Sequence, residues 1–176
     1  LLYHNMGSES DKHRYLEIIY KNSNRLLSLI NNIFDISKLE TNQLQLIENQ
    51  CSITNITKSI LKEIKPQLEH KTRVDFEIIN EITDVGFTLI ADETRVKQVL
   101  SNLIENALKF TNEGFIRVTI KLNNETNEVF FSVEDTGRGI SKEFQKILFN
   151  RFSQSDFTIS QNFGGAGLGL PISKGL

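Results

Sequence analysis

The stretch NLIENALKFT at residues 102–111 decides how we interpret this sequence. Asn102, Asn106 and Lys109 stand at i, i+4 and i+7, so in a helix the three side chains lie on one face. Asparagine is a middling-to-poor helix former, and two of them in a helix interior need a reason. Mg²⁺ takes oxygen ligands together with phosphates and waters, so amide oxygens near a lysine are typical of a magnesium–phosphate site. A solvated polar face is the simpler alternative, and this stretch alone does not exclude it.

A second stretch, DTGRGI at residues 135–140, directly follows a predicted strand. Glycine at positions 137 and 139 lets the backbone approach a flat ligand where a Cβ atom would collide. The carboxylate of Asp135 can accept hydrogen bonds from an exocyclic amino group such as that of adenine. A tight turn capped by the aspartate side chain explains the same residues equally well.

A third stretch, GGAGLGL at residues 164–170, places four glycines within six positions. Backbone N–H groups of such a loop can cradle phosphates, particularly where the loop leads into a helix. The stretch is not a Walker A motif, because no Gly-Lys-Ser/Thr follows it. It is not a dinucleotide-binding fingerprint either, because its spacing differs and no strand directly precedes it. A flexible linker is the alternative, although Leu168 and Leu170 argue against a fully solvated one.

Apolar periodicity outside these stretches predicts an α+β fold. One helix is expected at about 52–70, where Pro66 should kink it or end it early, and another, capped by Asp92, continues to about residue 110. Alternating residues predict strands at 44–48, 74–79, 87–91, 116–122 and 129–133. Because strands and helices are grouped rather than strictly alternating, we expect a two-layer α/β sandwich, with helices on one face of a mixed, mainly antiparallel sheet.

The N-terminal part predicts one long helix over about residues 10–41. Its apolar residues follow a heptad seam, which consists of Leu16, Ile19, Leu26, Ile30 and Ile33. A lone helix would leave this stripe in water, so we interpret it as a bundle-type helix that needs partner helices. The residues before it are too few to supply one, and we expect a second chain or a missing segment to provide them.

Bulk composition restricts the possible partners and compartments. The net charge of −2 over 176 residues gives no general attraction to nucleic acid. A single cysteine, Cys51, excludes an intramolecular disulfide framework and fits a reducing cytosol. No apolar run approaches the roughly 18–20 residues that span a bilayer. We therefore expect a cytoplasmic location, without nucleic-acid or membrane contact by this chain, although a parent protein could still be anchored in the inner membrane.

The order and spacing of these stretches closely resemble the N, G1 and G2 boxes of sensor histidine kinases, within the gyrase, chaperone and mismatch-repair ATPase superfold. FNRF at 149–152 resembles the F box of that family, and FDISKLE at 34–40 resembles the end of the second helix of its dimerisation domain. The resemblance implies two regions. Residues 1–42 would be a partial dimerisation region without the phosphoacceptor helix, and 43–176 an ATP-binding catalytic domain, truncated at the C-terminus.

The resemblance also implies ATP and Mg²⁺ as cofactors and assigns roles to individual residues. Asn106 would ligate Mg²⁺, with Asn102 beside the same ion or the phosphates. Lys109 would contact phosphate, and Asp135 would bind the adenine amino group. The remaining cofactor-binding residues would shape the adenine pocket or form the phosphate-facing hinge of an ATP lid: Gly137, Gly139, Gly165, Gly167, Leu168 and Gly169. This lid would span about 141–163, with Phe149 and Phe152 anchoring it by packing or serving as ordinary core aromatics.

One position separates kinase from ATPase within this superfold. The ATPase branches resemble one another in having a glutamate four residues before the metal-binding asparagine, where this chain has Asn102. An amide cannot take a proton from water at neutral pH. Glu105, next to Asn106, points roughly 100° away from it around the helix and is a poor substitute. The sequence therefore favours phosphoryl transfer to a protein acceptor over direct hydrolysis.

The acceptor itself is absent from this sequence. The family has a histidine followed by an acidic residue and Arg-Thr-Pro, whereas His4, His13 and His70 stand in other contexts and are interpreted as surface residues. We expect transfer of the ATP γ-phosphoryl group to a histidine outside this chain, homodimerisation through the helical region, and relay to a response-regulator aspartate. The chain alone would not phosphorylate itself. An ATPase of the same superfold and a non-catalytic dimerisation module remain the alternatives.

Overall fold

The computed structural model describes residues 9–84, 86–153 and 166–176, and the chain divides into two compact units, Leu1–Gln43 and Leu44–Leu176. The first unit contains α1 (Glu9–Glu40), which confirms the predicted long helix to within one residue at each end. The seam residues Leu16, Ile19, Leu26, Ile30 and Ile33 are between 40% and 59% exposed. Within this unit the apolar stripe therefore faces solvent, as expected of a bundle helix described alone.

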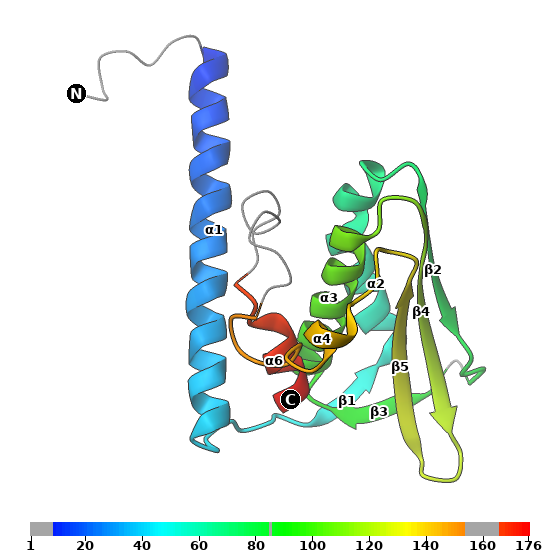
Figure 1. The fold of residues 1–176 in the computed structure, drawn as a ribbon. Coiled ribbons are helices and arrows are strands. Elements are labelled where there is room, and N and C mark those ends of the chain that lie inside the picture. Colours follow the sequence, from blue (N-terminus) through cyan, green and yellow to red (C-terminus); the bar gives the residue numbers. More distant parts are fainter. Residues whose placement is uncertain (1–8, 85, 154–165) are drawn as a thin grey trace. The chain divides into compact units, whose positions relative to one another are not determined.

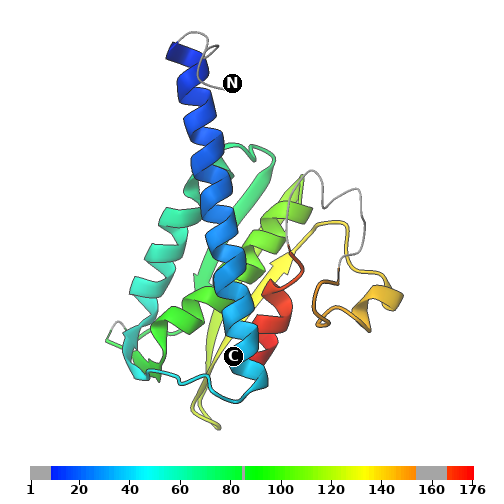
Figure 2. The same ribbon diagram turned by 90° about the vertical axis from the view of Figure 1, so that its left-hand side faces the viewer.

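The second unit carries the sheet and the remaining helices (Figure 1). Its elements follow one another in this order: β1 (Asn49–Ser52), α2 (Ile53–Glu69), β2 (Val74–Asn80), β3 (Thr88–Ala91), α3 (Glu93–Phe110), β4 (Gly114–Asn123), β5 (Glu128–Asp135), α4 (Lys142–Gln145) and α6 (Gly169–Gly175). Helix α3 lies between α2 and α6 and contacts both of them (Figure 2).

The strands form a mixed arrangement in which antiparallel pairing predominates. Strand β1 pairs with β3 antiparallel, β4 pairs with β5 antiparallel, and β2 pairs with β4 parallel. Helices α2 and α3 cover one face of the sheet β2-β4-β5 (Figure 1). The predicted α+β sandwich, with helices on one face of a mainly antiparallel sheet, is thereby confirmed.

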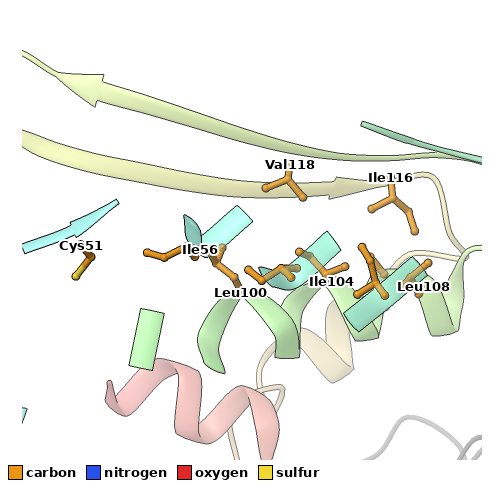
Figure 3. Close-up of a cluster of buried hydrophobic side chains, with 10 residues drawn as sticks. Cys51, Ile56, Leu100, Ile104, Leu108, Ile116 and Val118 are labelled. Atoms are coloured by element: carbon orange, nitrogen blue, oxygen red, sulfur yellow. The ribbon is translucent and has the colours of Figure 1, made fainter. Parts of the chain in front are cut away.

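The hydrophobic core lies between this sheet face and the two helices. Its buried residues come from β1, from two helical stripes at i, i+4 spacing and from alternate positions of β4: Cys51, Ile56, Ile60, Ile64, Leu100, Ile104, Ala107, Leu108, Ile116 and Val118 (Figure 3). The other face of the sheet is charged and partly exposed, with Arg117 contacting Glu77 and Glu134. This division into an apolar and a charged face fixes which side of the sheet the helices cover.

One detail of the sequence prediction was wrong. Residues 44–48 do not form a strand, because the chain enters β1 only at Asn49 and the N–H of Ile47 donates instead to Oδ2 of Asp92 at 3.0 Å. Helix α2 continues to Glu69, close to the predicted end at residue 70, so of the two effects expected of Pro66 an early end is excluded. Ile64 is buried and Leu68 packs on the same core, so packing on both sides of the proline offsets the hydrogen bond that it removes.

Candidate functional site

Helix α3 carries the predicted asparagine face, and its own ends are well defined. Asp92 is the N-cap, and its side chain accepts a hydrogen bond from the N–H of Arg95 at 3.2 Å. The pKa of the Asp92 carboxyl is lowered, chiefly because the N–H of Ile47 donates to it. An acidic residue in the first turn and Lys109 in the last turn complement the helix dipole.

The rotation of α3 about its axis is set by the core. Leu100, Ile104 and Leu108 are each at most 2% exposed and face the sheet. Asn102 and Asn106 each follow a core residue by two positions, which turns them about 200° around the helix, away from the core. Asn102, Asn106 and Lys109 are accordingly half-buried rather than buried. The predicted shared face therefore exists, and it is directed away from the sheet.

A carboxylate cluster, which we define as Thr111, Asp135 and Gly137, lies where the end of α3 meets the end of β5. Oδ1 of Asp135 accepts hydrogen bonds from the N–H of Gly137 at 2.8 Å and from the hydroxyl of Thr111 at 3.4 Å. Thr111 is fully buried, whereas Asp135 is exposed. Both bonds orient the carboxyl through one oxygen, and Oδ2 is the oxygen that we assign to a ligand.

Glycine is required at position 137 by close contact and fits position 139 by conformation. A Cβ atom on Gly137 would lie 2.7 Å from Oδ1 of Asp135 and 2.7 Å from the carbonyl oxygen of Phe110. Gly139 has φ of +70°, and a Cβ atom there would meet nothing within 4 Å in the described part of the chain. The first glycine lets β5 approach α3, and the second borders open space beside the carboxylate.

Two residues that sequence reasoning missed support this cluster. The hydroxyl of Thr136 accepts the N–H of Phe115 at 2.9 Å, which ties the end of β5 to the start of β4. The ammonium of Lys71 donates to the carbonyl oxygen of Thr111 at 2.5 Å. Thr136 lies inside the quoted DTGRGI stretch and was available as a candidate, whereas Lys71 is forty residues from its partner and carries no motif.

A glycine-rich cluster, which we define as Asn102, Gly167–Gly169 and Ser173, forms further toward the N-terminus of α3. At about 1.5 Å per residue, Asn102 lies about 13.5 Å from Thr111 along the helix axis. Nδ2 of Asn102 donates to the carbonyl oxygen of Gly169 at 3.3 Å and to the hydroxyl of Ser173 at 3.2 Å. A Cβ atom on Gly169 would lie 3.2 Å from Cγ of Asn102. The structure thus brings two of the predicted stretches together.

The segment before α6 is held by backbone and core contacts. Gly167 has φ of +68°, and its carbonyl oxygen accepts the N–H of Phe152 at 3.1 Å. Leu168 is 1% exposed, so it is a core residue of this unit and not part of a solvated linker. Gly165, which was predicted with these residues, lies outside the described ranges. The part of the predicted lid at 154–163 also lies outside them.

Two cations share one aromatic ring at the end of α3. Nζ of Lys109 lies 5.1 Å and Cζ of Arg138 lies 4.9 Å from the centre of the Phe110 ring. Cations over a ring face are attracted by its quadrupole. Arg138 stands in the quoted DTGRGI stretch, but sequence reasoning gave it no role; its position adds a second positive charge near Lys109.

The aromatic residues of the FNRF stretch do not belong to the core. Phe149 is 45% and Phe152 is 67% exposed, so their interpretation as ordinary core aromatics was wrong. Anchoring of the predicted lid by Phe152 stays a prediction, because residues 154–163 lie outside the described ranges. Phe149 does contact α6, because Nζ of Lys174 lies 5.1 Å from its ring centre. The histidines His13 and His70 are exposed as predicted, whereas His4 lies outside the described residues.

Glu105 lies about 100° around α3 from Asn106 and one helical turn before Lys109. Its side chain is exposed overall, yet the pKa of its carboxyl is raised, chiefly because the surrounding chain displaces water and secondarily because the Glu63 carboxylate repels its charge. Glu63 itself pairs with Lys97 at 2.6 Å. In the described ranges, no group of three or more histidine, cysteine or acidic residues could hold a metal ion. Nor does any described helix have the length and apolarity needed to cross a membrane.

Comparison with known proteins agrees with this geometry. Residues 91–176 match the family model described as histidine kinase-, DNA gyrase B-, and HSP90-like ATPase. The match begins just before α3 and extends through α6, so it includes both clusters. Two curated relatives align with nearly the whole chain. Hybrid signal transduction histidine kinase L of Dictyostelium discoideum is 39% identical over 94% of this chain and 10% of its own length.

Sensor protein GacS of Pseudomonas syringae is 39% identical over 92% of this chain and 18% of its own length. The chain thus spans less than a fifth of either relative. Among solved structures, full-length ShkA in complex with AMPPNP is 27% identical, with a TM-score of 0.76. That likeness covers 97% of this chain and 34% of ShkA. The similarity therefore extends over both units of the chain.

Proposed function

Because the chain belongs to the sensor histidine kinases, whose ATP-binding catalytic domain it carries, we propose that it binds ATP with Mg²⁺ and transfers the γ-phosphoryl group to a histidine outside the chain. The observation that carries this proposal is that two clusters both contact helix α3. An exposed carboxylate, fixed by two hydrogen bonds, lies at the C-terminal end of this helix, and glycine-rich backbone contacts Asn102 in the middle of it.

The carboxylate cluster fits the base of the nucleotide. Oδ1 of Asp135 is engaged by Thr111 and Gly137, so Oδ2 can accept a hydrogen bond from the adenine amino group. Gly137 lets the chain pack closely at Asp135, and the open space at Gly139 lets the backbone there approach a flat ring. These residues bind and orient the nucleotide; none of them takes part in bond making.

The asparagine face fits the metal and the phosphates. We assign Asn106 as the Mg²⁺ ligand and place the oxygen of Asn102 beside the same ion or the phosphates, because amide oxygens are the hard ligands that this ion prefers. When bound, Mg²⁺ neutralises the charge of the transferring phosphoryl group. Lys109 supplies a positive charge at the same face, and Gly165, Gly167, Leu168 and Gly169 supply backbone toward the phosphates.

Transfer to a protein acceptor is favoured over hydrolysis by the residues around Asn102. Its amide nitrogen is engaged by α6, and an amide cannot accept a proton from water at neutral pH. Glu105 lies about 100° around the helix from Asn106, and desolvation together with the Glu63 carboxylate raises the pKa of its carboxyl. We therefore assign positioning and charge neutralisation, rather than general base catalysis, to this face.

The remaining assignments concern the whole protein. We propose that residues 1–42 form the second helix of a dimerisation domain, where the exposed seam of α1 packs in a homodimer, and that 43–176 form the catalytic domain. The phosphorylated histidine would then pass its phosphoryl group to an aspartate of a response regulator, and the domain would act in the cytoplasm. The printed names of the two curated relatives, a hybrid histidine kinase and a sensor protein, support this assignment.

The proposal is tested by titrating the chain with a non-hydrolysable ATP analogue, with and without Mg²⁺. Asp135→Asn should abolish most binding of both adenosine and the analogue, whereas Asn106→Ala should remove the dependence on Mg²⁺ and leave adenosine binding unchanged. Glu128→Gln, an exposed carboxylate at the opposite end of β5, is the matched control. Nucleotide binding that survives Asp135→Asn, or steady phosphate release from ATP without any acceptor, would contradict the proposal.

A further inference from the structure

The contact between Asn102 and α6 uses the nitrogen of the amide. Nδ2 donates to the carbonyl oxygen of Gly169 and to the hydroxyl of Ser173, and both residues lie in α6. Gly169 permits this approach, because a Cβ atom there would lie 3.2 Å from both Cγ and Oδ1 of Asn102. The geometry requires a donor at position 102, which an amide has and an ionised carboxylate lacks.

Packing and hydrogen bonding make different contributions at α6. Leu168 and Ile172 are at most 1% exposed, so apolar burial keeps the helix on the core. Apolar contact is non-directional, however, and does not fix how the helix is rotated or shifted along α3. The two hydrogen bonds from Asn102 are directional and half-buried, and they specify that position.

We propose that Ser173 and the amide nitrogen of Asn102 form a latch that holds the start of α6 against α3 and thereby sets the affinity for the triphosphate part of the nucleotide. The inference rests on the proposed function and adds Ser173 to it as a positioning residue. It also gives Asn102 two uses, because the nitrogen holds α6 while the oxygen remains for the ion or the phosphates.

The two clusters should therefore respond differently when the latch is opened. Gly167, Leu168 and Gly169 directly precede or begin α6, so a change in α6 moves the backbone that we assign to the phosphates. Asp135 is fixed by Thr111 and Gly137. Within the described residues, no hydrogen bond joins these three residues to α6. Loss of the latch should weaken ATP binding and leave adenosine binding unchanged.

The first experiment compares Ser173→Ala with Ser173→Thr in titrations with adenosine and with a non-hydrolysable ATP analogue plus Mg²⁺. The alanine variant should bind the analogue about two- to tenfold more weakly, as expected for one lost hydrogen bond, with adenosine affinity unchanged. The threonine variant keeps the hydroxyl and should restore affinity. Equal losses for both ligands, or no loss at all, would overturn the latch.

A second variant separates the latch from a purely metal-binding role of Asn102. Asn102→Asp keeps an oxygen ligand for Mg²⁺ but cannot donate to Gly169 or Ser173. The latch predicts weaker binding of the Mg²⁺–analogue complex than in the wild type. A metal-binding role alone predicts binding that is preserved or tighter, and that result would overturn the latch.

A measurement without nucleotide makes failure of the latch distinguishable from failure of the proposed function. The backbone N–H groups of Ile172 and Leu176 donate within α6, at 3.1 and 3.0 Å, and their hydrogen exchange reports on this helix. Exchange at α6 should be faster in Ser173→Ala than in the wild type, with β4 unchanged. Identical protection in the two proteins would overturn the latch. A wild type that binds no nucleotide would overturn the proposed function and the effect on affinity, whereas faster exchange in Ser173→Ala would still show that the hydrogen bonds hold α6.

Discussion

The carboxylate cluster and the glycine-rich cluster are built on the same helix in different ways. At the first, Asp135 is held by a backbone N–H two residues away and by a threonine that is fully buried directly after α3. At the second, Asn102 reaches residues 67 and 71 positions further along the chain through side-chain hydrogen bonds. One half of the site is therefore part of the sheet-and-helix framework, and the other depends on the placement of a separate short helix.

This difference indicates that the two clusters have separate roles in binding. The framework fixes Asp135, to which we assign recognition of the base, so this carboxyl should be equally oriented with or without ligand. The helix α6 carries backbone that we assign to the phosphates, and its position depends on a few directional bonds added to apolar packing. Substitutions at the first cluster should affect every adenine-containing ligand, whereas those at the second should affect only phosphorylated ones.

The largest effect should come from Gly137→Ala, which tests whether the carboxylate cluster is rigid. A Cβ atom would lie 2.7 Å from the carbonyl oxygen of Phe110, and backbone cannot yield as a flexible side chain can. Overpacking of this kind lowers the free energy of unfolding by about 1–3 kcal/mol. Because the strain also displaces the Asp135 carboxyl, adenosine affinity should fall in titration calorimetry. Gly86→Ala, where the Cβ atom would make an ordinary 3.4 Å contact, is the control; unchanged adenosine affinity in Gly137→Ala would refute rigidity.

A smaller loss is expected from Thr111→Val, which removes the buried hydroxyl but keeps the shape of the side chain. Hydrogen bonds to charged groups contribute about 1.5–3 kcal/mol, and the 3.4 Å length of this one places it near the lower limit. Adenosine affinity should fall about tenfold, with weaker discrimination against guanosine, and Thr111→Ser should restore both. If the valine and serine variants bind alike, the hydroxyl does not orient Asp135.

Asp92→Ala tests the start of α3, on which both clusters depend. Loss of the N-cap should lower the free energy of unfolding by about 0.5–2 kcal/mol at pH 7 in urea denaturation. The pKa of Asp92 is lowered from 3.8 in the folded state, so its ionised form stabilises the fold above that pH, and this contribution is lost as the pH falls through the folded pKa. The difference from the wild type should therefore shrink below about pH 4, while Asp92→Asn, which retains a cap, should lose less at pH 7.

The smallest effect is expected from Glu105→Gln, at a position that lies about 100° around α3 from Asn106. Because the pKa of this carboxyl is raised from 4.5, the contribution of Glu105 to stability is fully present below pH 4.5 and is lost as the pH rises through the folded pKa. The glutamine variant carries no charge at either pH. Its melting temperature should therefore be slightly higher than that of the wild type at pH 7 and equal to it at pH 4. Its nucleotide affinity should be unchanged. A melting temperature lowered at pH 7 would show that the charge of Glu105 stabilises the helix.

The sequence predicted what local chemistry determines. The cap Asp92 and the end of α3 at Phe110 were correct, because capping and periodicity act within a few residues. Residues 44–48, which were wrongly predicted as a strand, also alternate. The N–H of Ile47, however, donates to Asp92, which is distant in sequence, and not to a neighbouring strand. Local pattern cannot reveal such competition.

The missed site residues share the same cause. Ser173 contacts Asn102 and Lys71 contacts Thr111 only because the fold brings distant segments together. Neither serine nor lysine has an unusual local pattern at these positions. The predicted site roles of Asn102, Asn106, Lys109 and Asp135 stay predictions, although the structure places Asn102 and Asp135 in defined hydrogen-bonded positions.

The parallel pairing of β2 with β4 has a consequence for how the protein folds. Strands β4 and β5 are joined by a short turn and can pair early, whereas β2 reaches β4 only after residues 81–113, which include β3 and α3, have crossed over. The entropy of closing this long connection must be overcome before the pairing stabilises the sheet. The helix that bears both clusters is therefore itself the crossover connection, and we expect the sheet and the asparagine face to be completed in one cooperative folding step.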